Sequence, residues 1–300
     1  MKKILGILIA LFSVSTVFGQ TIKPYILAST ASVKIKDLVN EVKTNLETNG
    51  FKVIGEYMPA TDASRWVMVV AHPELDKAVQ TVGGLTGFAA TLRVGLTEET
   101  DGVNITYTNP LYWGNAYFRE NFSKVSKNYD AIDAAFKASF SSIDQVIGTS
   151  FGSEKGESIE DLRKYHYMMG MPYFDDTKEL GDFDTYEAAI DKIEASFKTG
   201  KPGVAKVYRY DVPGKKLTLY GVALRGENGE EKFMPKIDIS SPKHTAFLPY
   251  EMLVMDGEVH MLHGRYRIAL SFPDLTMGTF TKIMSTPGDI EDLLKQLVEE

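Results

Sequence analysis

Residues 33–57 read VKIKDLVNEVKTNLETNGFKVIGEY, and two patterns of different period meet in this stretch at Gly50. From Ile35 to Leu46 the apolar residues recur three or four positions apart, which predicts an amphipathic helix that ends at the glycine. Residues 51–57 are then rich in apolar and aromatic side chains and are typical of a strand. We therefore expect a helix that leads directly into a strand.

The segments around this unit extend the pattern in both directions. Asp101-Gly102 lies between two strand-like runs and is a strong hairpin signal. Residues 58–62 have turn chemistry, and residues 129–147 carry an apolar stripe at helical spacing. The first half is thus expected to hold strands at 25–29, 51–57, 66–72, 88–96 and 103–108, and helices at 33–50, 73–82 and 129–147.

The second half of the chain repeats this order of segments. Gly50 corresponds to Gly200, Pro59 to Pro213, and Asp101-Gly102 to Asp256-Gly257, at offsets of 150, 154 and 155 residues. Such near-constant offsets predict an internal duplication. The expected elements are helices at 186–200 and 290–297, and strands at 204–210, 217–224, 248–255 and 259–263, the last continuing through 266–272. The predicted organisation is a signal peptide at 1–19, repeats at 20–150 and 161–300, and a linker at 151–160.

Residues 38–110 resemble the domain-of-unknown-function family 302. The resemblance rests on the helix, on Gly50-Phe51-Lys52-Val53-Ile54, on the turn Ala71-His72-Pro73 and on the hairpin that leads into Thr108-Asn109-Pro110. It implies an α+β fold, built as a tandem repeat of a two-layer β-α-β4-α unit that is similar to the TATA-binding-protein fold. The first copy is the clearer one, and the family supplies no reaction. Relatives often carry Cys-Asn-Pro at the turn, so thiol chemistry does not transfer to this chain.

Composition and the N-terminal residues restrict the classes of function. The 300 residues contain 33 Lys and Arg against 40 Asp and Glu, and this acidic balance argues against a nucleic-acid-binding protein. The chain has no Cys, which excludes disulfide bonds and metal centres with thiolate ligands. Lys2 and Lys3 precede an apolar run at residues 4–12, and Gly19 offers a cleavage site, as in a secretory signal. The run is shorter than the roughly 20 residues that span a bilayer. We expect a secreted protein, periplasmic or extracellular, with no transmembrane segment after signal removal.

Aromatic residues and one histidine are the first candidates for ligand binding. Tyr107, Trp113 and Tyr117 belong to a dense aromatic cluster, which could line an apolar pocket or could pack a helix onto the sheet. His72 lies at a strand end in the family-like turn, where it is either a structural residue or a pocket residue. Both interpretations stay open from the sequence.

Two arginines are candidates for anion binding. In the run from Arg265 to Leu270, a strand would place Arg265 and Arg267 on one face. Two neighbouring guanidinium groups can clamp a carboxylate or a phosphate. The alternative is a solvated face whose charges pair with acids such as Glu251 or Glu258 on a neighbouring strand.

Histidine and methionine recur close together at two places, which suggests copper as a possible ligand. His166 and Met168 would share a face of a strand, and so would Met261 and His263. Flexible Met side chains that fill an irregular core are the alternative. No cofactor is expected unless these residues bind copper or haem.

Residues 148–152 match the G-x-S-x-G pattern with Ser150 at its centre. A nucleophile elbow needs a strand before the serine and a helix after it, whereas here a helix is expected before it and a polar linker after it. The leading hypothesis is therefore a non-enzymatic envelope protein that binds a small apolar or amphipathic ligand. A copper or haem binder, an adaptor for another envelope protein and an enzyme with an unrecognised site remain as alternatives.

Overall fold

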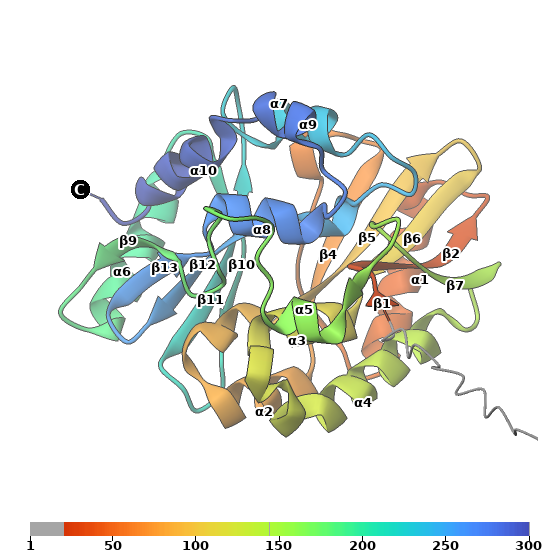
Figure 1. The fold of residues 1–300 in the computed structure, drawn as a ribbon, viewed down its shortest axis with the longest axis horizontal. Helices are drawn as coiled ribbons and strands as arrows, with labels where there is room; N and C mark the ends of the chain where they lie inside the picture. The colour runs from red at the N-terminus through yellow and green to blue at the C-terminus, as the bar shows by residue number, and fades with distance from the viewer. Residues whose placement is uncertain (1–20, 144, 300) are drawn as a thin grey trace, which may run out of the picture.

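The computed structural model describes residues 21–143 and 145–299, and the predicted signal peptide lies outside these residues. Two antiparallel sheets, each backed by helices, form the body of the molecule, with further helices between them (Figure 1). The predicted α+β class is confirmed. None of the described helices is long and apolar enough to cross a membrane.

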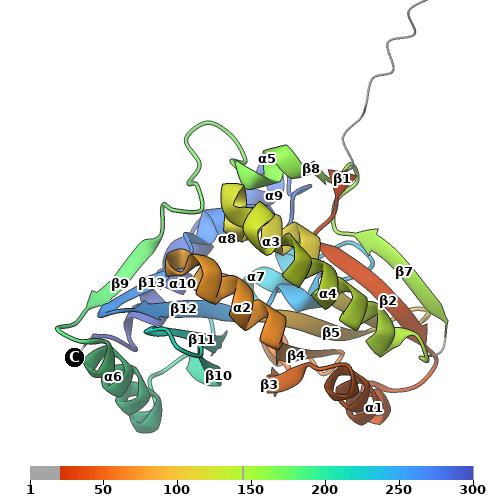
Figure 2. The same ribbon diagram turned by 90° about the horizontal axis from the view of Figure 1, so that it is seen from below.

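The first sheet has six strands in the order β3-β4-β5-β6-β2-β7. Helices α1 and α4 cover one face of this sheet (Figure 2). In the two central strands of the sheet, Val94 of β5 pairs with Tyr107 of β6. Its elements are β2 (Tyr25–Ala31), α1 (Ile35–Thr48), β3 (Lys52–Tyr57), η1 (Pro59–Thr61), β4 (Arg65–Ala71), α2 (Pro73–Val82), η2 (Gly84–Ala89), β5 (Leu92–Glu99), β6 (Gly102–Thr108), α3 (Pro110–Phe118), η3 (Arg119–Asn121), α4 (Phe122–Phe140) and β7 (Val146–Phe151).

The second sheet has five strands in the order β10-β11-β12-β13-β9, the order of β3-β4-β5-β6-β2. The common order agrees with an internal duplication, which stays a prediction. Its elements are β9 (Lys178–Asp182), α6 (Tyr186–Thr199), β10 (Val204–Asp211), β11 (Leu217–Leu224), α7 (Glu230–Ile237), η4 (Thr245–Phe247), β12 (Tyr250–Met255), β13 (Glu258–Met261), α8 (Gly264–Ser271), α9 (Met277–Thr281) and α10 (Thr286–Lys295). Between the two sets of elements lie β8 (Glu157–Ser158), paired with β1 (Thr21–Ile22), and α5 (Ile159–Arg163).

Four predicted segments differ from the structure. The strand expected at 88–96 begins only at Leu92, because Phe88 and Ala89 belong to η2. The helix expected at 129–147 begins earlier and ends at Phe140, and Ile147 lies 41% exposed in β7. The strand expected at 266–272 is helix α8, in which every residue except Arg265 is buried, so it lacks the broad polar stripe that marks a surface helix in sequence. The linker expected at 151–160 contains β8 and the start of α5.

The two sheets meet along a seam through short reciprocal segments. Segment η2 of the first half packs on β11 and β12, and η4 of the second half packs on β4, β5 and β6. At the sheet edges β3 approaches β10 so closely that a Cβ on Gly55 would lie 2.7 Å from the carbonyl oxygen of Val207. Glycine is therefore required at this crossing, and the halves form one continuous core.

A buried ion cluster lies at the centre of the seam. The Glu251 carboxylate on β12 pairs with Arg93 of β5 and with Arg267 of α8, whose Nη1 lies 3.2 Å away. All three side chains are at most 3% exposed. Nη2 of Arg267 also donates to the carbonyl oxygens of Phe247 and Pro249, at 2.8 and 2.7 Å. The cluster thus joins one strand of the first sheet to two elements of the second half.

Candidate functional site

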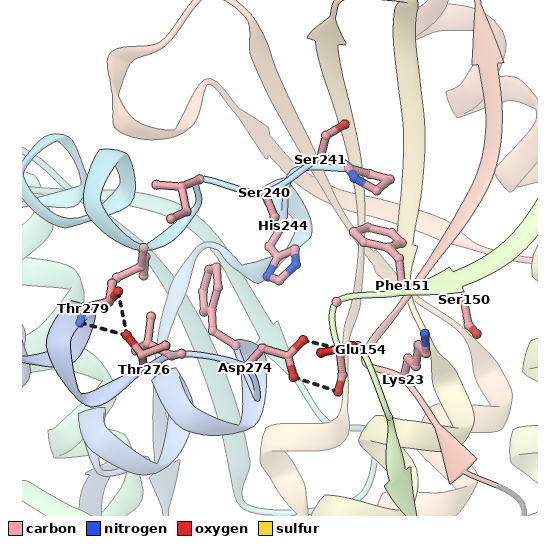
Figure 3. Close-up of a pocket in the computed structure, with 17 residues that line it drawn as sticks. Lys23, Ser150, Phe151, Glu154, Ser240, Ser241, His244, Asp274, Thr276 and Thr279 are labelled. Carbon is pink, nitrogen blue, oxygen red and sulfur yellow. Dashed lines mark hydrogen bonds between the residues drawn. The ribbon is translucent and has the colours of Figure 1, made fainter.

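A cavity of about 450 Å³ opens at one end of the seam (Figure 3). Three chain segments line it: residues 150–154 with Lys23, residues 237–244 between α7 and η4, and residues 272–279 between α8 and α9. Lys23 and β7 belong to the first half of the chain, residues 152–154 follow β7 in the segment that joins the halves, and the other two segments belong to the second half. This volume falls within the range of about 300–1,000 Å³ that is usual for small-molecule sites.

Hydrogen bonds between the halves hold the walls of the cavity. Asp238 pairs with Arg65 of β4 and accepts from the backbone N–H of His244 at 2.8 Å. Glu99, at the end of β5, accepts from the backbone N–H of Lys243 at 2.9 Å. On the opposite wall, Asp274 accepts from the backbone N–H of Glu154 at 2.6 Å, drawn as a dashed line in Figure 3. The cavity is therefore built by docking of the two halves.

His244 lies in the innermost wall of the cavity. Its ring is 5% exposed and packs against Tyr25, Phe151 and Phe272, with ring centroids 4.9, 5.7 and 4.6 Å away. Its Nδ1 atom is buried and has no hydrogen-bond partner among the described residues. Burial lowers the pKa of this imidazole and outweighs the carboxylate of Asp238, so His244 is neutral near pH 7.

The low pKa of His244 makes stability depend on pH. Because the unfolded histidine has a pKa of about 6.5, the unfolded state binds the proton first and stability falls as pH drops below that value. The substitution His244→Phe keeps an aromatic ring at this position. It should reduce the dependence of the free energy of unfolding on pH by up to about 1.4 kcal/mol per pH unit. Urea unfolding of both proteins between about pH 7.5 and 5.5 measures it. Equal slopes in the two proteins would contradict the assignment.

The aromatic residues predicted to bind ligand are packed inside the protein. Tyr107 stacks on Phe136 with ring centroids 4.4 Å apart and is 2% exposed. Trp113 donates its indole N–H to the carbonyl oxygen of Pro24 at 2.9 Å, and the buried ring of Tyr117 stacks on Phe174. None of these three aromatic residues lines the cavity described above. The packing interpretation therefore describes them better.

His72 is a helix cap. Its Nδ1 accepts from the backbone N–H of Glu74 at 3.1 Å, at the first turn of α2, and its ring packs against Phe51. Burial lowers the pKa of the imidazole and thereby favours the neutral, hydrogen-bond-accepting form. The turn that carries the family resemblance thus has a structural role at this residue.

The predicted pair of arginines is separated by the helix that replaces the strand. Arg265 is exposed, whereas Arg267, two positions later, is 2% exposed and pairs with Glu251. Residues two apart on a helix point in different directions, so a shared anion clamp on one strand face is wrong. The alternative pairing with Glu251 is present for Arg267, although in the core and not on a solvated face.

The histidines and methionines predicted to bind copper or haem serve other contacts. The Nε2 atom of His166 lies 2.7 Å from the carbonyl oxygen of Met171, in a loop and not on a strand, and Met168 is 42% exposed. Met261 is buried in β13, while His263 accepts from the backbone N–H of Arg265 and caps α8. Among the described residues no group of three or more His, Asp or Glu could hold a metal ion.

Ser150 lies in strand β7, where it pairs with Ile26. It lines the cavity together with His244, but Figure 3 shows its hydroxyl directed away from that ring. The serine lies in a strand, although the sequence predicted a helix before it. No helix follows the serine directly. The strained turn that exposes a catalytic serine is therefore missing.

Comparison with solved structures gives a partial similarity, whereas the other two comparisons find nothing. No family model and no curated protein matches the chain. Among solved structures, an uncharacterized conserved protein of the domain-of-unknown-function family 302 from Bacillus stearothermophilus is similar. The similarity has 15% sequence identity and a TM-score of 0.33, and it covers 42% of this chain and 97% of the other. It extends over less than half of this chain and identifies no ligand.

Apart from Ser150 and the two residues after it, the residues that line the cavity were not predicted from the sequence. Ser240, Ser241 and Pro242 form a turn-like stretch between two elements, and Asp274 follows a proline in another. Such stretches predict loops, but no sequence pattern places one loop against another more than 80 residues away. His244 carries no motif, and only its burial against three aromatic rings distinguishes it.

Proposed function

We propose that this protein is an exported binding protein for a small amphipathic ligand, which it holds in the cavity at the seam. The proposal rests on the composition of the cavity wall, which combines apolar and polar side chains. Phe151, Ile237 and Phe272 supply apolar surface, while Ser240 and Thr279 supply hydroxyl groups. Mostly apolar sites with a few convergent polar groups are typical of ligand pockets.

Export and internal duplication belong to the same proposal. The basic start, the apolar run at 4–12 and Gly19 support secretion to the periplasm or the extracellular side. The shared strand order of the two sheets supports a duplicated, family-302-like unit. A duplicated unit creates a seam, and a seam between related halves is a usual place for a ligand site.

Binding of the neutral apolar fluorophore N-phenyl-1-naphthylamine tests this function. Ser240 is exposed, lines the cavity and makes no side-chain hydrogen bond among the described residues, so Ser240→Phe should fill the cavity without disturbing the core. We expect the wild-type protein to enhance the fluorescence saturably. The variant should bind at least about tenfold more weakly, a loss of about 1.4 kcal/mol.

The matched control is Ser142→Phe, at an exposed turn beyond α4 and outside the cavity lining. It adds the same ring to the surface and should bind the fluorophore like the wild-type protein. Equal affinities of all three proteins, or no saturable binding by any of them, would contradict a ligand site in this cavity.

A further inference from the structure

Helix α9 separates the seam cavity from a second, apolar pocket. Thr276 and Thr279 line the seam cavity, as Figure 3 shows, whereas Met277 and Phe280 line the second pocket. Leu275 lines both, so its side chain forms part of the wall between them. The helix has five residues and none of them is buried.

The second pocket is small, but its lining is adaptable. It encloses about 30 Å³ between Met168, Met171, Met277, Ala269 and residues beside them. Met168 and Met277 are 42% and 53% exposed, and unbranched Met side chains change rotamer easily to admit an apolar group. Rotation of Leu275 would join this pocket to the seam cavity.

We propose that the two pockets form one site for a single-chain amphiphile with an uncharged, hydroxyl-bearing head. The head occupies the seam cavity, and the alkyl chain passes Leu275 into the methionine-lined pocket beneath α9. This inference rests on the proposed binding function and names the class of its ligand. The Met residues near His166 then serve as apolar contacts for the chain.

The charges of the seam cavity select the head group. Lys23 is outnumbered by Glu154 and Asp274, so a carboxylate or phosphate head would face a net negative wall. Hydroxyl groups of the wall, such as those of Ser240 and Thr279, can donate and accept hydrogen bonds, as sugar or glycerol hydroxyls do. A neutral polyol head satisfies both conditions.

Calorimetric titration with n-alkyl β-D-glucosides of six to ten carbons, below their micelle concentrations, tests the inference. Affinity should rise by up to about fourfold per added methylene until the second pocket is filled, since each methylene that enters it leaves water. Ala269→Leu places bulk in the second pocket and should abolish this rise for the longer chains only. Leu275→Ala opens the wall and should strengthen binding of the longest chain. Ala138→Leu, on the exposed face of α4, is the matched control and should leave the series unchanged.

The outcomes separate this inference from the function on which it rests. Affinities that do not rise with chain length, or a rise that neither variant changes, overturn the extension beneath α9. Fatty acids of equal chain length that bind more tightly than the glucosides overturn the head-group assignment. If Ser240→Phe still removes binding of the naphthylamine fluorophore in either case, the seam cavity survives as a site. If that variant has no effect, the proposed function itself fails.

Discussion

Replacing Glu251 with alanine is expected to lower the free energy of unfolding by about 3–5 kcal/mol, because the change leaves two buried guanidinium groups without their shared carboxylate. Arg93 and Arg267 are each 2% exposed, so water cannot replace the lost partner. The hydroxyl group of Tyr208 donates to the same carboxylate and loses this acceptor as well. Urea unfolding of the wild-type and variant proteins measures the loss.

Glu187→Ala is the matched control for this prediction. Glu187 is 66% exposed and lies 3.7 Å from Lys216, and exposed pairs of this kind contribute at most about 1 kcal/mol. A Glu251→Ala protein as stable as the control would mean that the ion cluster does not stabilise the seam. The docking of the two halves would then need another explanation.

Replacing Tyr107 with alanine should also be strongly destabilising, by about 3–5 kcal/mol, as for other large buried aromatic residues. Its ring stacks on Phe136 and Phe140, with centroids 4.4 and 5.5 Å away, and the deletion leaves a cavity beneath α4. The affinity of the folded protein for N-phenyl-1-naphthylamine should not change, because Tyr107 does not line the seam cavity. Chemical unfolding and fluorophore titration give the two values.

Tyr173→Ala provides the comparison for the aromatic deletion. Tyr173 is 43% exposed and stacks on His166 at the surface, so its removal should cost far less than removal of Tyr107. A stable Tyr107→Ala protein that has lost fluorophore binding would restore Tyr107 as a ligand residue and would remove the packing interpretation.

Much of the fold follows from local signals in the sequence. The helix that ends near Gly50 and the hairpins at Asp101-Gly102 and Asp256-Gly257 are present close to where their patterns predict them. Each of these signals acts within a few residues, through backbone geometry or through burial of one helix face. Helix α8 was not predicted because all of its residues except Arg265 are buried, so its sequence shows no alternation of apolar and polar faces.

The candidate site could not be predicted in the same way. Aromatic density drew attention to Tyr107 and Trp113, but density in sequence equally marks a core, and both residues are buried. The cavity instead joins loops near Glu154, Ser240 and Asp274 that have ordinary turn chemistry. These loops come into contact because of how the two sheets pack against each other. This packing depends on long-range contacts, which local sequence patterns do not predict.

Native mass spectrometry of the full chain, purified without added ligand or metal and gently desolvated, shows directly whether the seam cavity holds a ligand. We expect an excess mass on the wild-type protein and on Ser142→Phe that disappears on denaturation. For Ser240→Phe, whose new ring occupies the seam cavity, we expect the bare mass. A bare wild-type protein, or an excess mass carried equally by Ser240→Phe, would contradict the assignment of a ligand to this cavity.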